Sequence, residues 1–321
     1  MKDFDYYVED FMLFCSSKNL SIKTMKSYEQ TLKLFQLYME KEQDTREVDK
    51  VSTKQIRQYV EYLRTRGKYT VQVANSDINY PANRTDVGKE LSITTINNYI
   101  RNIKVFYNYL DEERIIKDNP ATRIKLLRNV AEKKEPLTRD ELRRLFNNFD
   151  IVTFHGYRDY VVTKLLLTTG ARIGETLSLV EDDINFNNNT VIFKDTKNKK
   201  EKVSFLNNKI VHELRKWLSF KERYMTTDIL FPTNRRTQLT IQNFGKNLRN
   251  VGNGAGVEGV HPHRLRYTFS VEFLKNGGSI YVLSRLLDHS TVQVTEIYLN
   301  MDKEDIRKEY MKHNPVDLID F

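Results

Sequence analysis

Residues 165–179 read LLLTTGARIGETLSL and join the end of one helix to the start of the next. The apolar run predicts a helix that stops at Gly170, and a second helix then begins with Arg172 in its first turn. Glu175 follows three residues later. An arginine near a helix start, after a glycine turn, can point a fixed fork of donors at a phosphate. The plainer interpretation is a surface arginine paired with Glu175, so the neighbouring motifs must decide between the two.

A lysine-rich hairpin is predicted further along the chain. Residues 189–206, NTVIFKDTKNKKEKVSFL, form two β-rich runs around a polar tip, in a half of the chain that is otherwise helical. The tip holds four lysines: Lys197, Lys199, Lys200 and Lys202. A charge run at a tip is usually no more than solvated, but it can equally place one ammonium in a groove or an active site.

The stretch GVHPHRLRYTFSVEFL, residues 259–274, contains His-x-x-Arg in two registers. Pro262 suits the first turn of a helix. His263 and Arg266 then share one helix face, whereas His261, the partner of Arg264, precedes the helix and is the weaker choice. A zinc site is not expected, because no cysteine accompanies the histidines and no His-Glu-x-x-His motif is present.

A histidine and a tyrosine follow in LLDHSTVQVTEIYLN, residues 286–300. On one continuous helix, His289 and Tyr298 would lie on opposite faces. Ser290 and Gln293 fit a capping box, however, which predicts that a new helix starts between His289 and Tyr298. Two elements that meet at a turn can aim both side chains at one point.

The order of these side chains along the chain suits phosphoryl transfer on DNA. A tyrosine hydroxyl can attack a phosphodiester and form a covalent intermediate. Arginines can neutralise the charge that grows in the transition state, and a general acid can protonate the leaving 5′ oxygen. The sequence offers no convincing carboxylate cluster for Mg²⁺. We therefore expect neither a metal nor another cofactor.

Composition fits a DNA-binding protein of two domains. The 321 residues carry a net charge of +9, and 39% of them are apolar. Residues 1–120 hold 19 basic and 18 acidic side chains, so nearly all of the excess lies in the second half. A mean hydropathy of −0.60 and the lack of long apolar runs argue against membrane spans. The single cysteine, Cys15, indicates a reducing cytoplasm and is expected to be a buried filler.

The first third of the chain is predicted to be a helical bundle. Apolar stripes and caps predict helices over residues 4–15, 21–42, 52–67 and 92–113. The connection 68–90 is long for a bundle, and a small hairpin, a disordered loop and a DNA-touching finger remain open.

A basic linker is predicted over residues 121–135, with Arg123, Lys125 and Arg128 as candidate DNA contacts. A capping box of Thr138 and Glu141 then starts the second domain.

Taken together, TGARIGETLSL, TKNKKEKVSF, HPHRLRYTFS and LLDHSTVQVTEIY resemble the tyrosine recombinase family, which includes phage integrases and Xer-like recombinases. The resemblance covers nearly the whole chain. It implies a mainly α fold: a SAM-like core-binding domain over residues 1–120, the linker, and a catalytic domain over residues 136–321 with a small antiparallel hairpin. The tail, from about residue 303, would dock on a neighbouring protomer.

The resemblance also implies the roles of the site residues. Arg172 and Arg266 would clamp the phosphate, and Glu175 would support the Arg172 motif. Tyr298 would be the nucleophile and give a 3′-phosphotyrosyl bond. Lys197 would be the hairpin lysine and general acid.

Three more residues complete the implied site. His263 would assist proton transfer, and His289 would bind or position the phosphate. Lys199 is the rival of Lys197 and a candidate DNA contact. Asp288 stands where family members often have glycine, and aspartate tolerates the left-handed turn better than most residues.

The family resemblance predicts a site-specific recombinase that assembles as a homo-tetramer on double-stranded DNA and exchanges strands through a Holliday junction without ATP. It would act in the cytoplasm at the nucleoid, with accessory proteins possible. A type IB topoisomerase shares the chemistry, and a DNA-binding regulator with an inactive catalytic domain is a third hypothesis. The insertion at 68–90 favours an integrase or transposase of a mobile element over a chromosome-dimer resolvase.

Overall fold

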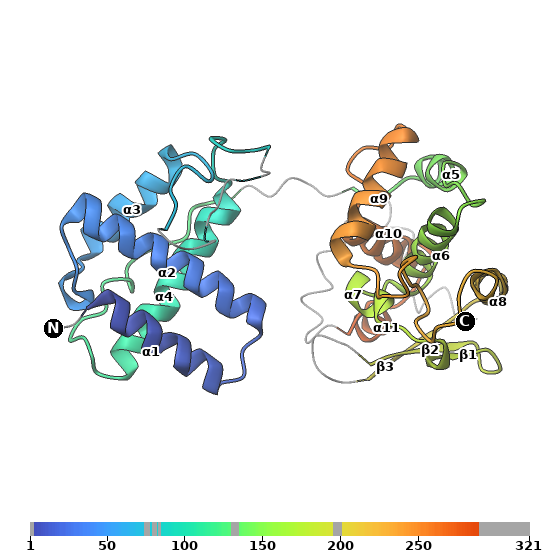
Figure 1. Cartoon of the computed structure of the whole chain (residues 1–321), viewed down its shortest axis with the longest axis horizontal. Coiled ribbons are helices and arrows are strands. Elements are labelled where there is room, and N and C mark those ends of the chain that lie inside the picture. Colours follow the sequence, from blue (N-terminus) through green and yellow to red (C-terminus); the bar gives the residue numbers. More distant parts are fainter. Residues whose placement is uncertain are drawn as a thin grey trace, which may run out of the picture. The chain divides into compact units, whose positions relative to one another are not determined.

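The protein is described by a computed structural model that covers residues 3–73, 78, 82, 85–129, 135–194 and 201–288. The chain divides into two compact units, Met1–Glu132 and Lys133–Phe321, and each is built mainly from helices (Figure 1). The described part of the second unit also contains a small antiparallel sheet. The predicted fold class is confirmed.

Four α-helices form the described part of the first unit, together with the short 3-10 helix η1 (Val48–Lys50). They are α1 (Phe4–Ser17), α2 (Ile22–Gln43), α3 (Thr53–Thr65) and α4 (Ile93–Glu112). Each begins at a polar cap, and Ser52 with Gln55 forms the predicted capping box before α3. The inward stripes of all four helices share one core, in which Cys15 is buried as expected. The helices predicted for this region are confirmed.

The insertion at 68–90 closes on itself where it leaves and rejoins the bundle. Gly67 and Glu90 form an antiparallel bridge. Next to it, the Lys68 N–H donates to the Lys89 carbonyl at 2.8 Å, and the Lys68 ammonium pairs with Asp86 at 3.2 Å. These contacts give the base of the insertion the form of a hairpin. Most of residues 74–84 lie outside the described ranges.

The first part of the predicted linker is attached to the first unit. The Asn97 side chain of α4 exchanges two hydrogen bonds with the backbone of Leu127, at 2.9 and 2.8 Å. Lys104 donates to the carbonyl of Ile124 at 2.9 Å, and the Ile124 side chain is buried in the first core. Residues 121–129 therefore follow the surface of the helical bundle, and the division between the units falls at Glu132 and Lys133.

The second unit packs its helices around α6. These helices are α5 (Arg139–Asn147), α6 (Phe154–Thr169), α7 (Ile173–Leu177), α8 (Asn208–Glu222), α9 (Ile241–Gly254), α10 (Pro262–Lys275) and α11 (Ile280–Leu286), with the 3-10 helix η2 (Glu181–Asp183). Helix α6 contacts α7, α8, α9 and α10, so it is buried on several sides. Within the described ranges, no helix combines the length and apolarity that crossing a membrane requires.

The sheet of the second unit has the order β1-β2-β3, with strands Ile184–Asn185, Thr190–Phe193 and Lys202–Phe205. Strands β2 and β3 are the predicted hairpin, paired so that Phe193 lies opposite Lys202. In β3 the polar side chains are buried and the apolar side chains are exposed, which is the opposite of the usual arrangement. Lys202 and Ser204 are buried, whereas Val203 and Phe205 are 53% and 67% exposed.

Candidate active site

Arg172 lies at the junction of α6 and α7. Helix α6 ends at Gly170, whose φ of +62° is the left-handed conformation that glycine adopts without strain. Arg172 is the N-cap of α7, one position earlier than the first-turn placement predicted from the sequence. Glu175 accepts from the Arg172 backbone N–H at 3.0 Å and from its Nη1 at 2.7 Å. One carboxylate thus fixes both the helix start and the guanidinium.

Lys202 completes the environment of Glu175. Its Nζ lies 3.5 Å from the Oε2 atom of Glu175 and 5.0 Å from the ring centre of Phe193. The side chains of Lys202 and Glu175 are only 6% and 2% exposed, whereas that of Arg172 is 26% exposed. The sequence pattern places Lys202 with the lysines of the polar tip, whereas in the structure it is buried at the start of β3.

Arg266 joins the same place from α10. Its Nη1 donates to the Gly170 carbonyl at 2.7 Å, and its Nη2 donates to the Leu287 carbonyl at 2.8 Å. These two hydrogen bonds connect the end of α6 to the end of α11, and the Arg266 side chain that makes them is buried. We call Arg172, Glu175, Lys202 and Arg266 the Glu175 cluster.

The two His-x-x-Arg registers lie in different surroundings. Pro262 is in the first turn of α10, as predicted, and His261 is its N-cap and accepts from the Arg264 N–H. The Arg264 guanidinium donates to the backbone carbonyls of Glu135 and Glu258, so it connects the first described residues of the second unit to the segment before α10. Of the two arginines, Arg266 is the one in the Glu175 cluster.

Electrostatics mark the Glu175 cluster as a positive site. Burial lowers the pKa of Lys202; Glu175 opposes this, but Arg266 and Arg172 lower the pKa further, and the net shift is downward. Burial alone would raise the pKa of Glu175. The positive charges of Lys202 and Arg172 outweigh this effect, so the pKa of Glu175 lies below its ordinary value. The cluster as defined has three basic side chains and one carboxylate, and this positive balance suits the binding of an anion.

The remaining predicted catalytic residues are either exposed on α10 or not described by the structure. His263 is exposed near the start of α10. Lys197, Lys199, His289 and Tyr298 fall outside the described residues. The turn before His289 is described as far as Asp288, whose φ of +52° is the left-handed conformation expected of it.

The candidate DNA contacts of the predicted linker lie on the first unit. Arg123, Lys125 and Arg128 are all exposed on the stretch that follows the bundle surface. Arg123 also lines a cavity of about 830 Å³ between η1 and the segment after α4. Their exposure leaves them available to a phosphate backbone.

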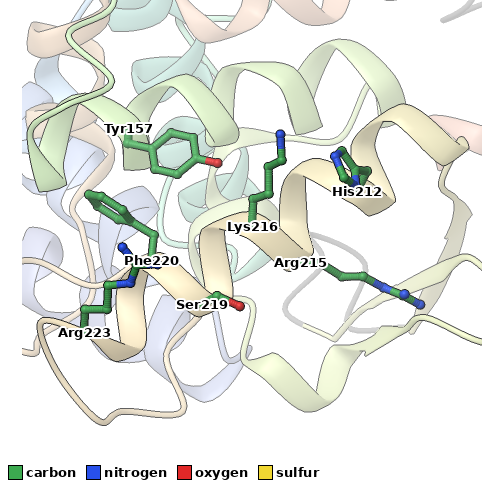
Figure 2. Close-up of a pocket in the computed structure, with 7 residues that line it drawn as sticks. All are labelled: Tyr157, His212, Arg215, Lys216, Ser219, Phe220 and Arg223. Carbon is green, nitrogen blue, oxygen red and sulfur yellow. The ribbon is translucent and has the colours of Figure 1, made fainter.

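A second basic surface lies on α8. A pocket of about 430 Å³ lies between α8 and Tyr157 of α6, and Figure 2 shows the residues that line it. Its α8 lining is His212, Arg215, Lys216, Ser219, Phe220 and Arg223. None of these residues belongs to the Glu175 cluster, so the pocket is a separate feature of the second unit.

Comparison with known proteins identifies the class. A sequence model of the phage integrase family matches residues 135–305, and one of the phage integrase N-terminal SAM-like domain matches residues 8–76. Tyrosine recombinase XerC of Bacillus pumilus is 30% identical over 236 residues, covering 71% of this chain and 77% of the relative. Tyrosine recombinase XerD of Oceanobacillus iheyensis is 26% identical over 318 residues, covering 97% and 99%.

Solved structures share the fold. The Tn1549 transposon integrase, in complex with a circular intermediate DNA, matches with a TM-score of 0.76 at 17% identity, over 97% of this chain and all of that one. The XerH site-specific recombinase bound to its difH substrate matches with a TM-score of 0.68 at 19% identity, over 91% and 80%.

Because the first family model spans more than half of the sequence, the chain belongs to the phage integrase family. It is a tyrosine recombinase, an enzyme of site-specific DNA recombination, as the sequence motifs indicated. The individual roles of the site residues remain predictions.

Proposed function

We propose that this recombinase cleaves and rejoins double-stranded DNA through a covalent bond between Tyr298 and a 3′ phosphate. The observation that carries the proposal is the Glu175 cluster, in which Arg172 and Lys202 share the Glu175 carboxylate and the buried Arg266 adds a further cation that acts on Lys202. Such a positive site, with Arg172 partly open to solvent, can bind the non-bridging oxygens of one phosphodiester. It is preorganised, so it loses little reorganisation energy when charge develops.

In the proposed reaction the Tyr298 oxygen attacks the phosphorus and the bond to the 5′ oxygen breaks. Arg172 and Arg266 neutralise the charge on the non-bridging oxygens. The leaving oxygen takes a proton from Lys197, with Lys199 as the competing donor, and His263 assists this transfer. His289 positions the phosphate. A 5′ hydroxyl from the partner strand then attacks the phosphotyrosine, which restores the phosphodiester without ATP and without a metal.

Assembly would couple these steps between protomers. We propose a homo-tetramer on two DNA sites, with the tail from about residue 303 docked on a neighbouring protomer and a Holliday junction as the intermediate. Arg123, Lys125 and Arg128 would contact the DNA backbone. The insertion at 68–90 supports a role in integration, excision or transposition of a mobile element, with accessory proteins as further partners.

Capture of covalent adducts tests the proposal and locates the DNA site in the same experiment. Wild type and Tyr298→Phe are expressed in a host that carries the native genome or element, the cells are denatured, and protein-linked DNA is sequenced. Adducts from wild type alone, gathered at a few positions, are expected. Dispersed adducts would instead favour a type IB topoisomerase. Absence of adducts, also with a nicked substrate that blocks rejoining, would favour a DNA-binding regulator.

A further inference from the structure

The register of β3 points to a role for Lys202. A slip of one residue would exchange the two faces of the strand. It would bury Val203 and Phe205, which are exposed, and bring Lys202 to the surface. Burial of apolar area alone would favour that arrangement. Removing an ammonium from water is costly unless a charged partner compensates, so the observed register depends on what Lys202 binds.

That partner is Glu175, which also binds Arg172. Lys202 and the Arg172 N–H both bind Oε2 of Glu175, while Nη1 of Arg172 binds Oε1. The carboxylate is rigid, so a force that holds one oxygen also orients the other. The position of Lys202 is thereby passed through Glu175 to the Arg172 guanidinium.

The exposed fractions of the Arg172 and Lys202 side chains indicate different roles. The Arg172 side chain is 26% exposed and can meet an incoming phosphate, whereas Lys202, at 6%, lies beneath it. Burial and the nearby arginines lower the pKa of Lys202, but Glu175 opposes that shift. The ion pair with Glu175 requires the charged form of Lys202.

We propose that Lys202 is a positioning residue of the recombinase, which acts through Glu175 to hold the Arg172 guanidinium against the scissile phosphate. The inference rests on the proposed function, in which Arg172 contacts that phosphate. It separates Lys202 from the general acid, which is the hairpin-tip residue Lys197 or Lys199. The competing assignment makes Lys202 itself the proton donor.

Single-turnover cleavage tests the coupling. The probe is a nicked form of the DNA fragment recovered in adduct capture, used at saturating protein. Lys202→Met should slow adduct formation roughly 10- to 100-fold, as expected for a misplaced catalytic group. The DNA Kd should change by less than about twofold, because other phosphate contacts dominate it. Lys216→Met, which removes the same charge from the α8 surface, should leave the rate unchanged.

A double variant reports whether Lys202 acts through Glu175. Glu175→Gln alone should be slow, and Lys202→Met added to it should cause no further loss, because the route to Arg172 is already broken. The double variant removes both charges, so it is also the one expected to fold if Lys202→Met alone does not. Losses that multiply would overturn the inference.

A sulfur leaving group separates positioning from proton donation. In a 5′-bridging phosphorothioate the departing atom is a thiolate, which needs no proton. Lys197→Ala, or Lys199→Ala if that is the donor, should recover its rate on this substrate, and Lys202→Met should not. Recovery of Lys202→Met would make it the general acid. If wild type forms no adduct at all, the proposed function fails and this inference fails with it.

Discussion

Two of the sets of buried charges in the described part of the second unit are built in opposite ways. Arg158 and Asp159 form a matched pair, each about 4% exposed and joined at 2.8 Å. Arg158 also donates to the Pro232 carbonyl, and Asp159 accepts from Asn247. In the Glu175 cluster, by contrast, Arg172 and Lys202 share the carboxylate of Glu175, and the buried Arg266 adds a further positive charge nearby.

The difference distinguishes structural from functional burial of charge. In the matched pair, burial raises the pKa of Asp159 although Arg158 and Asn247 oppose that shift, so the pair offsets only part of its desolvation cost. In the Glu175 cluster, burial lowers the pKa of Lys202, and the nearby Arg266 and Arg172 lower it further. We propose that a phosphate of the DNA substrate completes this arrangement.

The matched pair should respond most strongly to substitution. Asp159→Ala leaves the Arg158 charge buried with its main partner gone, so we expect a loss of about 3–5 kcal/mol in the free energy of unfolding. Denaturant titration measures it. Replacing both residues, as in Arg158→Met with Asp159→Leu, should recover most of the loss. If it does not, the pair has a function beyond packing.

The next effect concerns catalysis. Arg172→Ala should reduce the rate of adduct formation about 10²- to 10³-fold, the usual loss for one preorganised donor to a developing anion. Glu175 keeps Lys202 as a partner, so the melting temperature should stay near that of wild type. Cleavage of the nicked substrate gives the rate. A large drop in melting temperature with little change in rate would reverse the roles assigned to the two sets.

Weaker effects come from the helix caps of the two units. Thr138→Ala and Ser52→Ala each remove a capping box, before α5 and α3 respectively. Each should cost about 1 kcal/mol of stability. Thermal unfolding of each variant measures the loss, and neither should change cleavage by a saturating amount of folded protein. A cleavage defect from Thr138→Ala alone would show that α5 contributes to the site.

The weakest effect is a pH dependence. Because the folded-state pKa of Glu175 is lowered, its contribution to stability is fully present above its unfolded value, near 4.5. It is lost as pH falls through the lower folded value. The stability difference between wild type and Glu175→Gln should therefore shrink below pH 4.5. Denaturant titrations at several acidic pH values test this, and a difference that grows would contradict the ion-pair account.

Local signals in the sequence predicted much of the fold. Apolar stripes and caps predicted α1 to α4, and a glycine turn predicted the end of α6 at Gly170. The same motifs predicted Arg172 and Arg266 as site residues, and the structure brings both into one cluster. The chemistry of Tyr298 and Lys197 remains a prediction.

Long-range contacts could not be predicted in the same way. Lys202 resembled a solvated charge at a hairpin tip, and only the inverted faces of β3 reveal its burial. The Asn97 side chain attaches residues 121–129 to the bundle through hydrogen bonds to the backbone of Leu127. The two residues are 30 positions apart, so no local pattern indicates this contact. Arg172 was expected inside a helix turn, yet the Glu175 side chain makes it the cap.

Identifying the atom that is bonded to DNA would decide whether Tyr298 is the nucleophile. Trypsin should release residues 286–303 from captured adducts, a peptide whose single tyrosine is Tyr298. Mass spectrometry after nuclease digestion is expected to find a 3′-linked nucleotide phosphate on that tyrosine. A nucleotide on any other residue, or a 5′ linkage, would contradict the proposed chemistry of the site.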